Sequence, residues 1–370
     1  MNFIRVILLC LAVGGFILYQ QGNEQVVAAV QNGIKQFRHY AESIANHPKV
    51  SDWIGDVETG LQSLENKMKG VEPPKEVESP VLSIPEEQAF SIHNIEIGDT
   101  KENVENHAGP AVQSTYNEYG VKWFTYHENY QNFFMAAYNK EGKVSGLYTN
   151  QDVISSKLDI HLSDSKESVV QKLGEPLTGI RKGFVLYQVQ NPGEYHTYEL
   201  DNSYITVFYD KHEGDTVTAL QIISKSLEDQ KTDYFGISSN ELKEGFEYQL
   251  FDLVNASRVH HGLHPLSWDD RVKVTAREHS ADMAENQYFS HDNLKGQSPF
   301  DRLEEDQIWY RAAGENIAMG QVSSIFAHEG LMNSIGHRKN ILSPDFHSLG
   351  TGVAFDSQSR PYYTEKFIGK

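Results

Sequence analysis

The feature that most constrains the middle of this chain is an internal repeat of about 65 residues. Asp-Thr-Lys-Glu-Asn-Val at residues 99–104 is echoed by Asp-Ser-Lys-Glu-Ser-Val at residues 164–169, and a Gly–Pro pair follows each copy. In both copies an aspartate lies three residues before a glutamate, a spacing that caps a helix N-terminus reciprocally. The Gly and Pro then indicate the helix end. Each copy therefore predicts a short helix, capped at Asp99 or Asp164.

Strand-like runs rich in aromatic and β-branched residues follow each predicted helix, with turn signals between them. The runs lie at residues 123–126, 133–138 and 144–148, and then at 184–189, 195–200, 204–209 and 217–223. We expect each copy to form a short helix with an antiparallel meander, and the two copies to pack as one α+β domain over residues 89–228. The region contains no titratable cluster with catalytic spacing. Its tyrosines leave a binding role open, although a sheet face packed on helices is favoured.

An apolar run at residues 6–19 follows Arg5. It predicts a signal-anchor at residues 1–20, a single pass that leaves the bulk of the chain extracytoplasmic. The alternative is a cleaved signal peptide and a secreted protein. Cys10, the only cysteine, lies inside this run, which excludes disulfides within the chain and a cysteine nucleophile in a folded domain. A cysteine-free exterior fits a bacterial protein.

Apolar residues at steps of three and four predict amphipathic helices, a stalk, over residues 21–70. Oligomerisation through this stalk is an alternative, but the repeats are too short to favour it. Residues 71–88, with four prolines among glutamates, predict an extended linker. The formal net charge of -19 argues against a nucleic-acid partner.

The last third predicts helices around a small sheet, after a linker at residues 229–240. Helical patterns cover residues 242–261, 271–286 with Asp269 as the cap, a short stretch after Ser298-Pro299, and 323–333. Strands are expected at residues 349–355 and 362–368. This order favours a three-layer α-β-α sandwich over residues 241–370, so the whole chain is predicted to be an α+β multidomain protein.

Three motifs lie among these elements. They are Tyr-Phe-Ser-His-Asp at residues 288–292, Gly-Glu-Asn-Ile-Ala at 314–318, and Asn-Ser-Ile-Gly-His-Arg-Lys-Asn-Ile-Leu at 333–342. In this order and spacing the chain resembles the bacterial branch of the CAP superfamily, the cysteine-rich secretory and pathogenesis-related proteins. Asn255, Arg258 and Leu-Ser-Trp-Asp at residues 266–269 share in the resemblance. By its repeat and position, the region before them resembles the CAP-associated N-terminal domain of Bacillus-type proteins.

The resemblance implies a cleft lined by two histidines and two acids. It matches His291 and His337 to the histidines and Glu315 to one acid. The motif aligns Ser334 with the other acid, and Glu329, one turn earlier, is the candidate carboxylate in its place. Two imidazoles and one carboxylate are ordinary zinc ligands, so a zinc ion held by His291 and His337 is a further hypothesis.

Three functions remain open at this point. The first is a cell-surface binding or scaffold module that holds a metal, lipid, peptide or cell-wall ligand in the cleft; the resemblance implies lipid and sterol binding in some members. The second is a hydrolase outside the membrane, in which His291 or His337 is the base and Glu315 orients it. In the third, the repeat domain binds a partner and the CAP domain is structural. We favour the binding module.

Overall fold

The computed structural model of this protein describes residues 77–182, 185–189 and 193–370. The expected anchor, the stalk and the first part of the linker lie outside these residues. Residues 77–88 form neither helix nor strand, as expected of a linker. Within the described residues, no helix is both long and apolar enough to cross a membrane. Val77–Arg258 and Pro265–Lys370 form one compact unit, which contains an N-terminal β-rich domain and a C-terminal domain.

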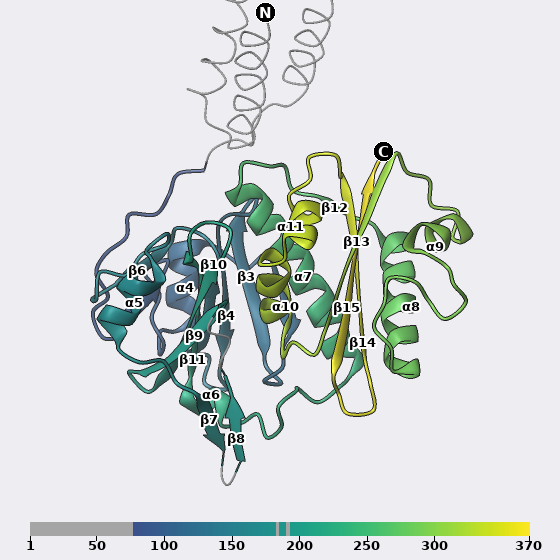
Figure 1. Cartoon of the computed structure of the whole chain (residues 1–370). Coiled ribbons are helices and arrows are strands. Elements are labelled where there is room, and N and C mark those ends of the chain that lie inside the picture. The colour runs from purple at the N-terminus through teal and green to yellow at the C-terminus, as the bar shows by residue number, and fades with distance from the viewer. Residues whose placement is uncertain (1–76, 183–184, 190–192) are drawn as a thin grey trace, which may run out of the picture. The chain divides into compact units, whose positions relative to one another are not determined.

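A seven-stranded antiparallel sheet organises the N-terminal domain, in the order β2-β3-β4-β5-β11-β10-β9 (Figure 1). Its strands are β2 (Gln113–Tyr116), β3 (Lys122–Glu128), β4 (Gln131–Tyr138), β5 (Val144–Thr149), β9 (Tyr195–Leu200), β10 (Ser203–Asp210) and β11 (Thr216–Ser224). The two repeats join where β5 pairs with β11. Two small ribbons, β1 (Phe90–Ile92) with β6 (Ile154–Ser156) and β7 (Gly179–Lys182) with β8 (Val185–Gln188), complete the domain.

The repeat helices are α4 (Lys101–Ala108) and α5 (Lys166–Leu173). The expected caps, Asp99 and Asp164, are corrected by one residue: Thr100 and Ser165 are the N-caps, and each hydroxyl accepts a bond from the backbone N–H three residues later. The aspartates instead accept backbone N–H bonds from the turns before the helices. A hydroxyl at the N-cap accepts a hydrogen bond from one of the free backbone N–H groups of the first turn, which is why serine and threonine are strongly preferred at this position.

The C-terminal domain is the α-β-α sandwich that the sequence predicts. Its sheet has the order β12-β14-β15-β13, from β12 (Ser267–Trp268), β13 (Ala312–Met319), β14 (Ser348–Phe355) and β15 (Pro361–Gly369). In Figure 1, α8 (Asp270–Asn286) and α9 (Pro299–Glu305) lie on one side of this sheet. Three helices lie on the other side, α7 (Asn240–His260), α10 (Ser324–Met332) and α11 (Ile335–Ile341).

Two elements that carry the motifs were not expected from the sequence. Residues 314–318, the second motif, lie inside strand β13, and residues 335–341 of the third motif form helix α11. Both segments mix glycine and polar residues, so their local pattern indicates neither structure. They are fixed by neighbours, since β13 pairs with β15 along its whole length.

The two domains meet through α7 and α10. In the chain, α6 (Lys225–Glu228) lies between the last strand of the seven-stranded sheet and α7. A shared apolar core joins Trp123, Tyr148 and Phe208 of the sheet to Leu253 of α7 and Ile325 of α10. The other face of α7 packs its Phe246, Leu250 and Val254 in the core of the C-terminal sheet. Helix α7 is therefore buried on two sides, because it contributes to one apolar core with the seven-stranded sheet and to another with the C-terminal sheet.

Candidate functional site

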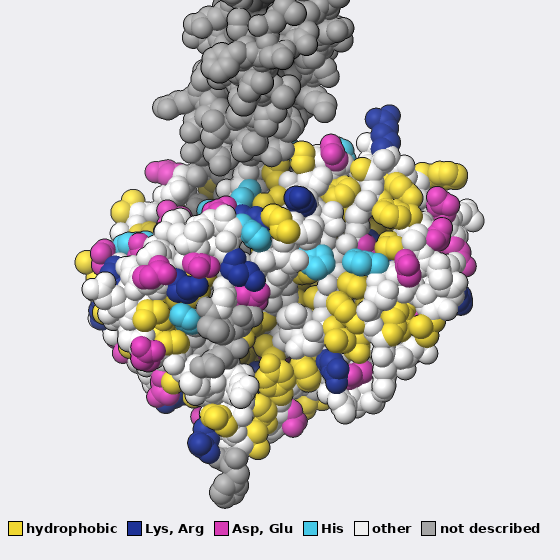
Figure 2. Space-filling model, viewed as in Figure 1, with side chains coloured by type: hydrophobic (Ala, Val, Ile, Leu, Met, Phe, Trp, Pro, Cys, Tyr) yellow, Lys and Arg dark blue, Asp and Glu magenta, His cyan; other side chains and the backbone are white. Residues whose placement is uncertain are grey.

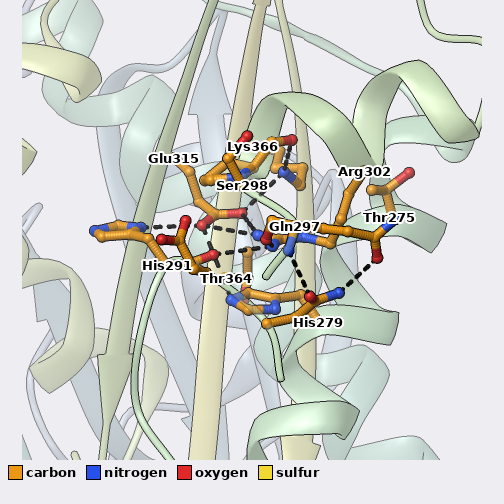
Figure 3. Close-up of polar contacts among 12 residues, drawn as sticks. Thr275, His279, His291, Gln297, Ser298, Arg302, Glu315, Thr364 and Lys366 are labelled. Atoms are coloured by element: carbon orange, nitrogen blue, oxygen red, sulfur yellow. Dashed lines mark hydrogen bonds and ion pairs between the residues drawn. The ribbon is translucent and has the colours of Figure 1, made fainter. Parts of the chain in front are cut away.

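The site is built around Glu315, whose side chain is 1% exposed on strand β13. One carboxylate oxygen lies 2.9 Å from Lys366 Nζ and 2.9 Å from Arg302 Nη2. The other oxygen lies 3.0 Å from His291 Nδ1. Figure 3 shows these three side chains converging on Glu315 from different elements. We call His291, Glu315 and His337 the histidine site.

Sheet register and a capped helix create this arrangement. Glu315 and Lys366 are directly opposed partners on β13 and β15, so cross-strand pairing alone brings their side chains together. Arg302 comes from α9, which starts at Ser298 with a complete capping box and Pro299 in its first turn. Arg302 Nη1 also donates to the backbone oxygens of His291 and Gln297, each at 2.9 Å. The arginine thus fixes the His291 loop as well as Glu315.

Opposing effects determine the charge of Glu315. Burial raises the pKa of its carboxyl, but the hydrogen bond from His291 and the charges of Lys366 and Arg302 together outweigh burial and lower the pKa to about 2. The carboxylate is therefore ionised at neutral pH, and its oxygens are occupied by two cations and an imidazole. A carboxylate held in this way is a weak proton acceptor.

His291 occupies the loop between α8 and α9, and its side chain is 47% exposed. Donation from its Nδ1–H to Glu315 leaves Nε2 as the acceptor of the neutral ring. A histidine oriented by a carboxylate can serve either as a hydrogen-bonding ligand or as a base. The geometry therefore supplies an oriented imidazole at the surface.

His337 lies on α11 and is half-buried. Burial lowers the pKa of its imidazole, and electrostatic repulsion from His291 lowers this pKa further. Its backbone oxygen accepts a bond of 3.2 Å from Asn316 Nδ2, the residue after Glu315. Its buried Nδ1 has no hydrogen-bond partner among the described residues. Figure 2 shows histidine side chains next to one another on this face, with hydrophobic side chains beside them.

The structure places the two other candidates differently. Glu329 lies on α10 against the N-terminal domain, where its carboxylate accepts a bond of 2.5 Å from Tyr148 Oη. Glu329 therefore contributes to the contact between the domains and does not lie beside the histidines as expected. Ser334 begins α11, but its hydroxyl makes no capping bond within the described part of the chain. The structure joins His291 to Glu315, connects the backbone of His337 to Asn316 beside Glu315, and places Glu329 elsewhere.

Comparison with known proteins agrees with this architecture. A family model described as "CAP-associated N-terminal" matches residues 97–234, and one described as "Cysteine-rich secretory protein family" matches residues 251–367. This chain carries a CAP domain behind a CAP-associated N-terminal domain. The recognition of both domains from the repeat and the three motifs is confirmed.

Two relatives from Bacillus subtilis (strain 168) match about a third of the chain each. The uncharacterized membrane protein YlbC is 48% identical over 122 residues, which are 33% of this chain and 34% of YlbC. The uncharacterized protein YkwD is 42% identical over 125 residues, which are 34% of this chain and 48% of YkwD. The match thus spans less than half the length of either relative.

Two solved structures cover both domains. An extracellular protein containing a SCP domain from Bacillus anthracis str. Ames has a TM-score of 0.65 at 25% identity, and the match covers 81% of this chain and all of that one. A cysteine-rich secretory protein from Staphylococcus aureus has a TM-score of 0.60 at 14% identity, with 78% and 98% covered. The second likeness shows the fold alone.

Three residues that surround Glu315 in the histidine site were not predicted from the sequence: Arg302, Lys366 and His279. Lys366 left a signal, because a charged pair, Glu365-Lys366, interrupts an otherwise apolar predicted strand. His279 Nε2 lies 3.0 Å from Ser290 O and 3.9 Å from Glu315, and burial is the main reason why its pKa falls to about 4. Arg302 gave no local signal, since its partner is chosen by how α9 docks on the sheet.

The zinc hypothesis is a poor fit to these residues. Among the described residues, no group of three or more His, Cys, Asp or Glu side chains is arranged to hold a metal ion. Glu315 is the acid that contacts His291, and both of its oxygens already bind cations or an imidazole. A divalent ion there would face Lys366 and Arg302 at close range and would be repelled. The arrangement therefore favours a site without a metal.

Proposed function

We propose that this protein is a membrane-anchored, extracytoplasmic binding module that holds a ligand of the cell envelope at the histidine site. The observation that carries the proposal is the binding of the Glu315 carboxylate by Lys366 and Arg302. This leaves two imidazoles that can hydrogen-bond a ligand, and it removes the free carboxylate that acid–base catalysis would need.

The surroundings of the histidines support a ligand with an apolar part. Phe289 and Leu294 flank His291 in the sequence, Ile335 precedes His337 closely, and all three side chains are exposed. Exposed apolar residues beside oriented polar groups are typical of a binding surface. A lipid, a peptide or a cell-wall fragment fits this description.

The proposed location rests on the N-terminal apolar run and on the relatives. One relative is called a membrane protein, and a protein with the same two-domain architecture is called extracellular. A single-pass anchor would hold both domains outside the membrane, next to such ligands. Secretion after signal cleavage is the alternative.

A hydrolase is the competing proposal, supported by the 3.0 Å contact that orients His291 on Glu315. The test uses the full chain in detergent micelles, with soluble peptidoglycan fragments and a short-chain phospholipid as probes. Calorimetry measures affinity, and mass spectrometry measures breakdown of each probe. We expect at least one probe to bind unaltered, with binding lost in His291→Ala and His337→Ala and kept in the control His107→Ala. Breakdown that stops in His337→Ala would instead establish the hydrolase.

A further inference from the structure

A hairpin of the CAP-associated domain contacts the segment that carries His337. The turn between β10 and β11 lies against Asn333, which ends α10. Asn333 Nδ2 donates to Tyr209 O at 2.8 Å, and Lys211 N donates to Asn333 Oδ1 at 2.9 Å. His212 Nε2 donates to Asn333 O at 3.1 Å. One asparagine thus makes three bonds to the hairpin, with Tyr209, Lys211 and His212.

A second group of contacts comes from Arg338, the residue after His337. Its Nη1 lies 2.6 Å from Asp210 Oδ2, and its Nη2 lies 2.9 Å from Glu213 Oε1. Arg338 and Asp210 are both buried, so their ion pair is shielded from solvent and salt. The planar guanidinium of Arg338 also fixes the directions of its hydrogen bonds to the two carboxylates, which the ammonium of a lysine would not do.

These contacts lie on both sides of His337 in the sequence, at Asn333 and at Arg338. Ser334 provides no side-chain cap to α11 within the described residues. On its inner side, the segment meets β13 through the bond from Asn316 to His337 O and through the bonds from Asn340 Nδ2 to Glu315 O and Asn316 Oδ1. On its outer side it is held by the hairpin. The segment that carries His337 is therefore held from two domains, and His337 belongs to only one of them.

We infer that the β10–β11 hairpin of the CAP-associated domain positions His337, with Arg338 and Asn333 as the positioning residues through which it acts. The CAP-associated domain is then a structural part of the histidine site, and a change in how the hairpin docks alters what the site can hold. This inference rests on the proposed function only for its consequence in binding; the positioning itself is a property of the unliganded protein.

The test reads the His337 ring directly, by NMR of the full chain in micelles with ¹³C-labelled histidine. The variant His337→Gln assigns the ring signal. We expect Arg338→Ala to move and broaden the His337 signal while the His107 signal stays in place. Arg338→Lys, which keeps one charge for Asp210, should restore the signal in part. Arg360→Ala is the control, because it removes an arginine–aspartate ion pair, with Asp356, that lies within the CAP domain.

Glu213→Gln covers the case in which Arg338→Ala does not fold. It removes only the exposed half of the contact, and a smaller shift in the same direction is expected. A folded Arg338→Ala or Glu213→Gln protein with an unchanged His337 signal would overturn the inference, since the hairpin would then join the domains without positioning the ring. No ligand is present in this experiment, so a failure to find a ligand for the site leaves its result intact.

Discussion

Tyr148 Oη donates a hydrogen bond of 2.5 Å to Glu329 Oε1 across the boundary between the two domains. Tyr148 lies on β5 of the CAP-associated sheet and Glu329 lies on α10 of the CAP domain, and both side chains are buried. Replacing Tyr148 by Phe would leave a buried carboxyl without this donor. We expect Tyr148→Phe to lower the free energy of unfolding by about 1–3 kcal/mol, measured by guanidinium denaturation.

The control for this change is Tyr116→Phe, because Tyr116 is exposed at the end of β2. Its loss of a hydroxyl should leave the unfolding free energy within about 0.5 kcal/mol of the original. Equal effects of the two substitutions would show that the bond to Glu329 contributes nothing to stability.

Carboxyl groups buried at the domain boundary predict a fall in stability with rising pH. Burial raises the pKa of Glu329, of Asp252 on α7 and of Glu118 to about 7 each. A folded-state pKa above the unfolded value means that the stabilisation is complete below the unfolded pKa and is lost as the pH rises through 7. We expect the free energy of unfolding to decrease from pH 5 to pH 8, by roughly 1–3 kcal/mol per group.

Glu329→Gln tests the assignment to individual groups. The amide keeps an acceptor for Tyr148 and does not titrate, so this variant should show a shallower decrease between pH 5 and pH 8. An unchanged slope would exclude Glu329 as a contributor. Glu315 acts in the opposite direction but only in acid, since its lowered pKa removes stability as the pH falls from about 4 to about 2.

The ion pair between Lys366 and Glu315 lies in the interior of the CAP sheet, with both side chains almost fully buried. Lys366→Met removes one cation and leaves a buried carboxylate only partly compensated. We expect a loss of about 3–5 kcal/mol in unfolding free energy. The double variant Lys366→Met with Glu315→Gln should recover part of the loss. Lys370→Met, at an exposed lysine of the same strand end, is the control and should change little.

Zinc titration of the full chain by calorimetry tests the metal hypothesis. Because the Glu315 oxygens already meet Lys366, Arg302 and His291, we expect no stoichiometric binding at neutral pH. Binding of one equivalent that disappears in both His291→Ala and His337→Ala would contradict this expectation and would establish a two-histidine zinc site.

Helix α8 packs directly on strand β14 at Gly352, where a Cβ atom would lie 2.1 Å from Arg277 N. Backbone cannot move aside as a flexible side chain can, so Gly352→Ala should destabilise the CAP domain by about 1–3 kcal/mol or more. Gly330→Ala is the matched control, because nothing lies within 4 Å of a Cβ there and the residue is helical. It should be neutral or stabilising by up to about 1 kcal/mol. Thermal unfolding of both variants measures the difference.

The sequence by itself determined the elements whose signals are local. The repeat at residues 99–104 and 164–169 predicted α4 and α5, and Asp269 and Ser298 marked helix starts that the structure confirms. Strand-like runs located six strands of the first sheet and β14 and β15 of the second, but not β2, β12 or β13. Three motifs in order were enough to recognise the CAP domain and to select His291, Glu315 and His337. Caps, turns and periodicity act within a few residues, so they can be read without a fold.

The tertiary structure alone decided which side chains surround those residues. Lys366 reaches Glu315 through strand register, Arg302 reaches it through the docking of α9, and Glu329 turns to Tyr148 because α10 lies against the other domain. Each partner comes from a separate element, and its choice depends on how the apolar faces of α7 and α10 pack between two sheets. Contacts between distant elements follow from that packing, because no local pattern in the chain records which surfaces will meet.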